Sequence, residues 1–383
     1  MKEHKSVGTN LKTYYYYTNN KAEEKDVKGV IIIATGIEGT GALYDEIGEY
    51  LDSKGYALYA IDEWGYGKTG KVVKTSYKNL KRKELHFTSY NIHALSFLAK
   101  QQHPQAPIYL IGNDFGAMLS LYLIREFPEI VDKVVTIGWG MPRAQDFGFF
   151  LTAWLRKIAF YDSSAAKMAH FNKNRRLSLR FERHEKYAWL SSDLDQVNKI
   201  KEAGFIDTPG TVGHYFYYYQ RKIRTPLFMR MKKTDRNTPM LFLSGDEDLT
   251  TLKGRKTRQL ERFYERKKFT NVTSRVVPGR HELLFEKNRF ENLELILNWL
   301  ETDTIVENYS YEANEIKNDY EDIEVIGTNP QSAPVEEKEI VLEEKEENVE
   351  NIIDVTSEET PVNLNELQEA EDDLLIRTHK ESK

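Results

Sequence analysis

The chain has 383 residues, of which 40% are hydrophobic, enough for one large domain of roughly 250–300 residues with further sequence outside it. It contains no cysteine, which excludes disulfide bonds, thiol chemistry and cysteine-ligated zinc. The first residues show no apolar signal-peptide core and no run of about 18 apolar residues occurs, so we expect a cytoplasmic protein without a membrane span.

The formal net charge of −6 conceals two parts of opposite sign. Residues 301–383 hold 26 Asp and Glu against 6 Lys and Arg, a balance of −20. The other 34 acidic and 48 basic residues leave the rest of the chain at +14. A basic body suits an anionic partner such as phospholipid headgroups or nucleic acid, and the alternative is that both charge blocks only serve solubility.

Strands and helices are predicted to alternate along most of the chain. Apolar runs that end in Gly or in acidic residues predict strands within residues 28–36, 56–67, 107–112, 131–140, 238–248 and 272–286. Helical spacing of apolar residues predicts helices over 41–55, 85–104 and 289–303, and another in the stretch 107–127 after its turn at 112–117. Repeated alternation of this kind is typical of the α/β class, with a mostly parallel sheet flanked by helices.

Residues 143–232 interrupt this alternation. They are rich in Arg, Lys, Phe and Tyr and show helical spacing, which predicts a helical cap inserted between a first core part, 1–142, and a second, 233–303. Residues 304–383 are acidic and poor in aromatic side chains, and such a composition predicts a mostly disordered tail. Within it, only 362–376 has the spacing of an amphipathic helix.

The stretch PIYLIGNDFGAMLSLYLIREF carries a tight turn between a strand and a helix. Asp114 occupies the position at which the G-x-S-x-G turn of many hydrolases has its nucleophilic Ser. Gly112 and Gly116 flank it, and small residues are needed there because strand and helix pass closely. The alternative is an ordinary Asx turn, but the acid and the histidine found downstream favour a nucleophile elbow.

Two later loops supply an acid and a histidine. Ligands of an open parallel sheet bind beyond the carboxyl ends of the strands, where SGDED and VVPGRHELLFE both follow predicted strands. The resulting chain order is nucleophile, acid, base. We predict His281 as the base and Asp248 as the acid that accepts its second ring N–H, with Asp246 as the competing acid.

Several of these segments resemble one hydrolase group. Residues 34–70 resemble the first third of the lysophospholipase/monoacylglycerol lipase group of α/β-hydrolases. Residues 185–200 are similar to a cap segment of the bacterial members of this group. The elbow, acid and histidine loops also look like those of the group. The likeness covers residues 25–303 and implies a lipid-like ester substrate. It also implies an oxyanion hole formed by the backbone N–H groups of Ile37 and Phe115.

The sequence departs from this group in two places. Thr35 stands where the group usually has His, and Asn113-Asp114-Phe115 stands where it has His-Ser-Met. A carboxylate has no proton to give to His, and its attack on an ester carbonyl would form an anhydride from which the carboxylate leaves again.

Three functions therefore stay open. The first is a lysophospholipase- or monoacylglycerol lipase-like hydrolase of a lipid-like ester. The second is an epoxide hydrolase or dehalogenase-type enzyme, in which Asp114 attacks an sp³ carbon and His281 activates water. In such an enzyme, Tyr187 and tyrosines within 214–222 would donate hydrogen bonds to the oxygen of an epoxide. The third is a non-catalytic protein that binds lipid.

Expected partners follow from motifs and charge. Metal-ligand spacings, P-loops and dinucleotide fingerprints are missing from the sequence, so we expect no cofactor and no metal. Basic and apolar residues interleave in 173–186 and 220–236, which suits peripheral contact with an anionic membrane, and no nucleic-acid fold is recognised. If the acidic tail competes for this surface, deletion of 304–383 should raise vesicle binding, and high salt should weaken both contacts.

Overall fold

The computed structural model describes residues 1–8, 12–36, 39–74, 84, 87–165, 177–181, 185–203, 210–227 and 234–305. These residues belong to one compact unit, Met1–Tyr311. The tail predicted over 304–383 lies outside the described residues from residue 306 onward, and so does the predicted helix 362–376.

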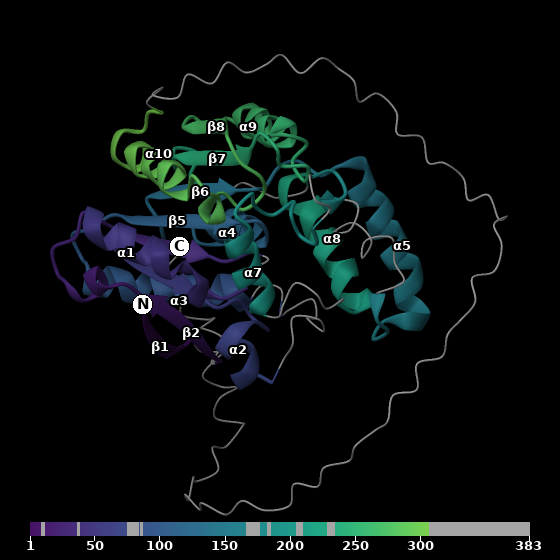
Figure 1. Ribbon diagram of the computed structural model, residues 1–383, viewed down its shortest axis with the longest axis horizontal. Coiled ribbons are helices and arrows are strands. Elements are labelled where there is room, and N and C mark those ends of the chain that lie inside the picture. The colour runs from purple at the N-terminus through teal and green to yellow at the C-terminus, as the bar shows by residue number, and fades with distance from the viewer. Residues whose placement is uncertain are drawn as a thin grey trace, which may run out of the picture. The chain divides into compact units, whose positions relative to one another are not determined.

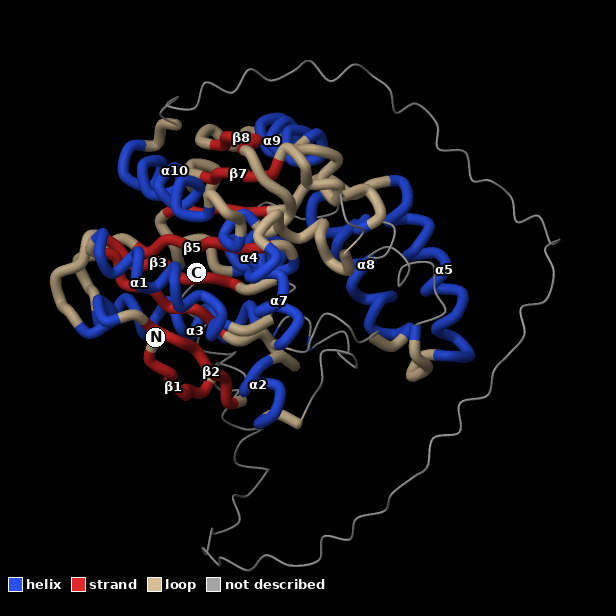
Figure 2. Tube along the Cα trace, in the orientation of Figure 1, coloured by secondary structure: helices blue, strands red, loops and turns tan. Residues whose placement is uncertain are grey.

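Eight strands form one sheet in the order β1-β2-β4-β3-β5-β6-β7-β8 (Figure 2). The strands are β1 (Lys2–Val7), β2 (Thr13–Thr18), β3 (Gly29–Ala34), β4 (Tyr56–Ile61), β5 (Ile108–Asn113), β6 (Lys133–Ile137), β7 (Met240–Gly245) and β8 (Val272–Val277). From β4 to β8 all neighbours are parallel, whereas β1 and β2 join antiparallel. The mostly parallel sheet is confirmed, and the two N-terminal strands are an addition that the sequence did not suggest.

Helices cover both faces of the sheet (Figure 1). The helical elements are η1 (Asn20–Glu23), η2 (Gly41–Tyr44), α1 (Asp45–Lys54), α2 (Gly67–Val72), α3 (Phe87–Gln102), α4 (Phe115–Glu126), α5 (Ala144–Phe160), α7 (Leu194–Glu202), α8 (Val212–Leu227), α9 (Arg255–Arg266), η7 (Leu283–Phe285) and α10 (Arg289–Thr302). Because side chains alternate along a strand, Ile32 of β3 faces the core under α3, α4 and α9, while Ile31 and Ile33 face the core under α1 and α10.

The chain between β6 and β7 contributes α5, α7 and α8 among its described residues. Figure 1 shows α5 and α8 lying side by side at one end of the sheet. Phe150 of α5 stacks on Phe216 of α8, with 5.4 Å between ring centroids. The predicted helical character of this insertion is thus seen, while its limits at 143 and 232 stay a prediction. In the part of the chain that the structure describes, no helix is long and apolar enough to cross a bilayer.

Candidate active site

Asp114 alone makes the turn between β5 and α4. Its φ of 41° and ψ of −107° are unusual for a residue with a side chain, and its N–H donates to the carbonyl of Ile137, 3.0 Å away. An Asp just before a helix normally caps the first N–H groups, but this carboxylate makes no capping hydrogen bond. An Asx turn therefore does not describe the loop, and the carboxylate instead faces the ring of His281.

Gly112 and Gly116 permit the close approach that this turn requires. A Cβ atom on Gly116 would lie 2.0 Å from the carbonyl oxygen of Ala34, and one on Gly112 would lie 2.6 Å from Cα of Ala117. Both neighbours are backbone atoms that cannot move aside. The spacing of small residues around Asp114 is thus a requirement of packing between β3, β5 and α4.

The structure brings Asp114, Asp248 and His281 together at the carboxyl edge of the sheet. His281 Nε2 lies 3.5 Å from Asp114 Oδ1, and His281 Nδ1 lies 3.2 Å from Asp248 Oδ1. The side chains of His281 and Asp248 are 1% and 0% exposed, whereas that of Asp114 is 20% exposed. Asp246 is engaged elsewhere, since its Oδ1 accepts from the Gly279 N–H at 3.0 Å. Solvent and substrate can therefore reach this arrangement at Asp114.

Asp248 is held as an ionised carboxylate by the turn that follows it. Its Oδ1 accepts from the backbone N–H and the hydroxyl of Thr250, at 2.8 and 2.7 Å, and its Oδ2 accepts from the Thr251 hydroxyl at 2.9 Å. Burial alone would raise the pKa of Asp248, but the charge of His281 and these hydrogen bonds outweigh it and lower the pKa.

His281 lies between negative charges. Burial acts to lower its pKa, but the charge of Asp248 and the contact with Asp114 outweigh burial and raise the pKa well above its ordinary value. The ring also packs against Trp189, with 5.1 Å between ring centroids. The two carboxylates therefore favour the charged form of His281, which can donate a proton, next to the side chain of Asp114, which can accept one.

A third carboxylate faces the same ring, and sequence reasoning missed it. Glu282 is fully buried, its Oε1 lies 3.8 Å from His281 Nε2, and its Oε2 accepts a hydrogen bond from the Asn113 side-chain amide. The signal available in the sequence was a Glu directly after the histidine of the loop that follows the last strand.

The histidine loop is held by the segment that precedes α7. The N–H of Glu282 donates to the carbonyl of Leu190 at 2.8 Å, and the Arg280 guanidinium donates to the carbonyls of Ala188 and Ser191 at 2.7 and 3.0 Å. These backbone contacts fix His281 and Trp189 relative to each other.

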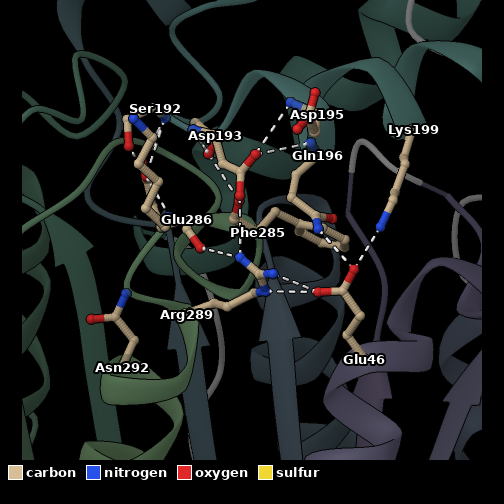
Figure 3. A network of polar contacts seen from close by, with 12 residues as sticks. Glu46, Ser192, Asp193, Asp195, Gln196, Lys199, Phe285, Glu286, Arg289 and Asn292 are labelled. Atoms are coloured by element: carbon tan, nitrogen blue, oxygen red, sulfur yellow. Dashed lines mark hydrogen bonds and ion pairs between the residues drawn. The ribbon is translucent and has the colours of Figure 1, made fainter.

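Figure 3 shows the polar network that anchors the same segment to the core. Arg289 of α10 donates to Glu46 of α1 at 2.6 Å and to Asp193 at 3.2 Å. Lys199 and Gln196 of α7 donate to Glu46 at 2.6 and 3.1 Å. The network joins α1, α7 and α10, and so ties the insertion to both parts of the core.

Of the two residues predicted to form the oxyanion hole, the structure describes Phe115. Phe115 is the first residue of α4, and the first N–H groups of a helix have no partner within the helix, so its N–H is placed to donate to an anion. Ile37 lies outside the described residues. Thr35 is buried and its hydroxyl donates to the carbonyl of Ile61 at 3.2 Å.

Among the predicted tyrosine donors, Tyr218 of α8 is electrostatically coupled to Asp114. Burial and then the charge of Asp114 raise the pKa of Tyr218 well above its ordinary value. Its ring stacks on Phe115 with 5.8 Å between centroids. Tyr187 instead packs in the core with Trp189. Over the described residues, no cluster of His, Asp and Glu could hold a metal ion.

The sequence profile of one family, described as a hydrolase family and as "Serine aminopeptidase, S33", matches residues 25–288 of this chain. Among curated protein sequences, none matches. The word serine in the family description contrasts with Asp114 at the elbow of this chain.

Solved structures share the fold at low sequence identity. A carboxyl esterase from Bacillus coagulans is 17% identical, with a TM-score of 0.65 over 78% of this chain and 97% of that one. A monoglyceride lipase from Saccharomyces cerevisiae is 12% identical, with a TM-score of 0.58 over 80% and 96%. A monoacylglycerol lipase from Paleococcus ferrophilus is 17% identical, with a TM-score of 0.55 over 76% and 99%. The predicted α/β-hydrolase fold is confirmed.

Proposed function

The chain belongs to the hydrolase family described as serine aminopeptidase S33, and from this premise we propose that it hydrolyses a lipid-like ester by direct attack of water. The observation that carries the proposal is the pairing of the Asp114 carboxylate with His281 Nε2, 3.5 Å apart, backed by the buried Asp248. This pair supplies a base and an acid side by side, which is what ester hydrolysis through water needs.

In the proposed reaction, Asp114 acts as the base. A water molecule loses a proton to its carboxylate as the water oxygen attacks the ester carbonyl carbon. The carbonyl oxygen becomes an oxyanion that the N–H of Phe115 stabilises. His281 Nε2–H then protonates the alkoxide as the carbon–oxygen bond breaks, and the proton held by Asp114 passes to Nε2 to restore the resting state.

The lipid-like substrate is supported by the surroundings of Asp114. Phe115, Tyr218 and Trp189 place aromatic rings next to the reacting groups. Aromatic surroundings favour an apolar chain over a sugar or a charged group. The monoacylglycerol lipases among the structures of the same fold support the same class of substrate.

Covalent attack by Asp114 on an sp³ carbon is the second candidate. The coupling of Asp114 to Tyr218 favours it, because a phenol beside the nucleophile could donate to the oxygen of an opening epoxide. Once alkylated, Asp114 would lose its charge and the pKa of His281 would fall. Neutral His281 would then activate the water that cleaves the alkyl ester.

Replacement of Asp114 separates the two candidates. The D114S variant restores a hydroxyl beside His281, so we expect it to keep turnover of a monoacylglycerol or lysophospholipid and to gain labelling by a fluorophosphonate. D114N, which has neither base nor nucleophile, should lose turnover by at least about 100-fold. If the wild type instead turns over a fatty epoxide or a haloalkane and D114S does not, the second candidate replaces the first. A wild type inert toward all four substrates would point to a non-catalytic lipid-binding protein.

We also propose that the protein meets anionic membranes through α5. Leu151, Trp154, Leu155 and Ile158, with Phe147 one turn earlier, lie on one face of this helix and are 44–78% exposed. The opposite face packs on α8. Residues 143–232 hold 17 Lys and Arg against 8 Asp and Glu, a charge that complements anionic headgroups around an apolar, Trp-bearing stripe.

Sedimentation with phosphatidylglycerol vesicles tests this surface. The L155E/I158E variant should bind at least about tenfold more weakly than the wild type, because two charges would enter the headgroup region. A matched control is F97E, which replaces an exposed aromatic residue of α3. Equal vesicle binding by L155E/I158E and the wild type would refute the proposal. Native mass spectrometry that shows a dimer held together through α5 would refute it as well.

A further inference from the structure

We infer that Glu282 is a positioning residue, whose buried carboxylate keeps His281 protonated and oriented while Asp114 carries the proton taken from water. This inference rests on the proposed function, since it concerns the moment at which Asp114 has become neutral. It concerns a side chain that is not part of the chain order of nucleophile, acid and base.

The geometry places Glu282 on the reactive side of the ring. Its Oε1 lies 3.8 Å from His281 Nε2, the nitrogen that also faces Asp114, whereas Asp248 faces Nδ1. The other oxygen of Glu282 accepts from the side-chain amide of Asn113. Because Asn113 is the last residue of β5, the elbow itself fixes the second carboxylate.

A carboxylate at this position has a clear consequence for the reaction. In the resting state Asp114, Asp248 and Glu282 all lie within 4 Å of the ring. When Asp114 takes a proton, the negative charge nearest the reacting atoms disappears. Glu282 and Asp248 then still favour the charged ring, so His281 stays an acid until the alkoxide takes its proton.

The other groups around His281 do not supply this charge on the Nε2 side. The Thr250 hydroxyl lies 3.0 Å from Nδ1 and is neutral. Trp189 covers the ring, and Gly138 beyond β6 offers only backbone. The Arg143 guanidinium interacts with the Asp248 side and donates to the Leu249 carbonyl at 3.0 Å.

Among the described residues, Tyr218 is a further titratable group near the site, and the charge of Asp114 acts on it. Burial keeps the phenol neutral at neutral pH, because it raises the pKa of Tyr218 well above its ordinary value. In the inferred arrangement, the negative charge that remains near Nε2 is that of the Glu282 carboxylate, whose Oε1 lies 3.8 Å from this nitrogen.

The test uses the full chain in a D114N background, which imitates the neutral state of Asp114. The imidazole of His281 is titrated by ¹⁵N NMR in D114N and in D114N/E282Q, without substrate. We expect the pKa of His281 in the double variant to be lower by about one to two pH units, the size of effect that a close carboxylate has. Equal pKa values in the two variants would overturn the inference.

A matched control separates charge from packing. Glu286 is also buried, but its carboxylate accepts from Ser192 and from the Arg280 N–H and does not contact His281. E286Q should lower thermal stability without shifting the His281 titration, and an equal shift in D114N/E286Q would refute the role of Glu282.

Turnover gives the second readout. With an active ester substrate, E282Q should move the alkaline limb of the kcat profile down by about one pH unit, and E282D should restore part of it. An unmoved alkaline limb in E282Q would contradict the inference. Because the NMR titration needs no turnover, failure of the proposed function and failure of the role of Glu282 give different results.

Discussion

Replacement of Gly138 by Ala should displace the ring of His281 without replacing any side chain that reacts. Gly138 follows β6 with a φ of +67°, and a Cβ atom there would lie 2.9 Å from Cε1 and 3.0 Å from Nδ1 of His281. Ordinary contact begins at 3.4 Å, so the ring must move by about 0.5 Å. Since a shift of 1 Å in a catalytic group can cost about 100-fold in rate, this shift should lower kcat/KM by about tenfold.

Gly55 provides the matched control for this variant. Its φ is +85°, but the nearest atom to an added Cβ is Cγ of Lys28 at 3.5 Å, which is ordinary contact. In urea unfolding, the free energy of unfolding of both G138A and G55A should be lower by about 1–2 kcal/mol, because an L residue is strained at positive φ. Hydrolysis of a short 4-nitrophenyl ester should fall only in G138A. Full activity in G138A, or equal losses in both variants, would refute the placement of the ring.

Two further predictions concern the supports of the site. The contacts of Lys199, Arg289 and Gln196 lower the pKa of Glu46 to about 2, so the stability they give is present above pH 4.5 and is lost as the pH falls toward 2. At pH 7, the free energy of unfolding in urea should therefore be lower for E46Q than for the wild type. The difference should be about 1 kcal/mol at most, because the carboxylate is part-exposed, and it should vanish near pH 2. T250V removes one hydroxyl donor to Asp248. In urea unfolding, the free energy of unfolding should fall by about 1–3 kcal/mol, and turnover should fall as well. Unchanged turnover would contradict the role of Thr250.

Much of the sheet could be predicted because its central strands are buried on both faces. β3 and β4 appear in the sequence as unbroken apolar runs that end in Gly or acidic residues, and such runs are hard to mistake. Loops that follow parallel strands converge at one edge, so the approach of Asp114, Asp248 and His281 could also be expected from chain order. β1 and β2 gave no such signal, since β1 is mostly polar and exposed and β2 is a run of tyrosines.

The parts of the site that escaped prediction depend on side chains far apart in the sequence. Glu282 matters only because its carboxylate reaches Asn113, 169 residues away, and no local pattern contains that contact. Arg289 and Glu46 are separated by 243 residues and pair only once α1 and α10 share a face of the sheet. The direction of the Asp114 carboxylate depends on a backbone geometry that the sequence permits but does not specify.

Single turnover in ¹⁸O-water tests the central claim, that Asp114 is a base and is not covalently modified. An excess of enzyme is mixed with a monoacylglycerol, and mass spectrometry follows the released fatty acid and the peptide that carries Asp114. The proposed reaction predicts one ¹⁸O atom in the fatty acid and none in the peptide. Label in Asp114 that accumulates with turnover would contradict the claim and establish a carboxylate nucleophile.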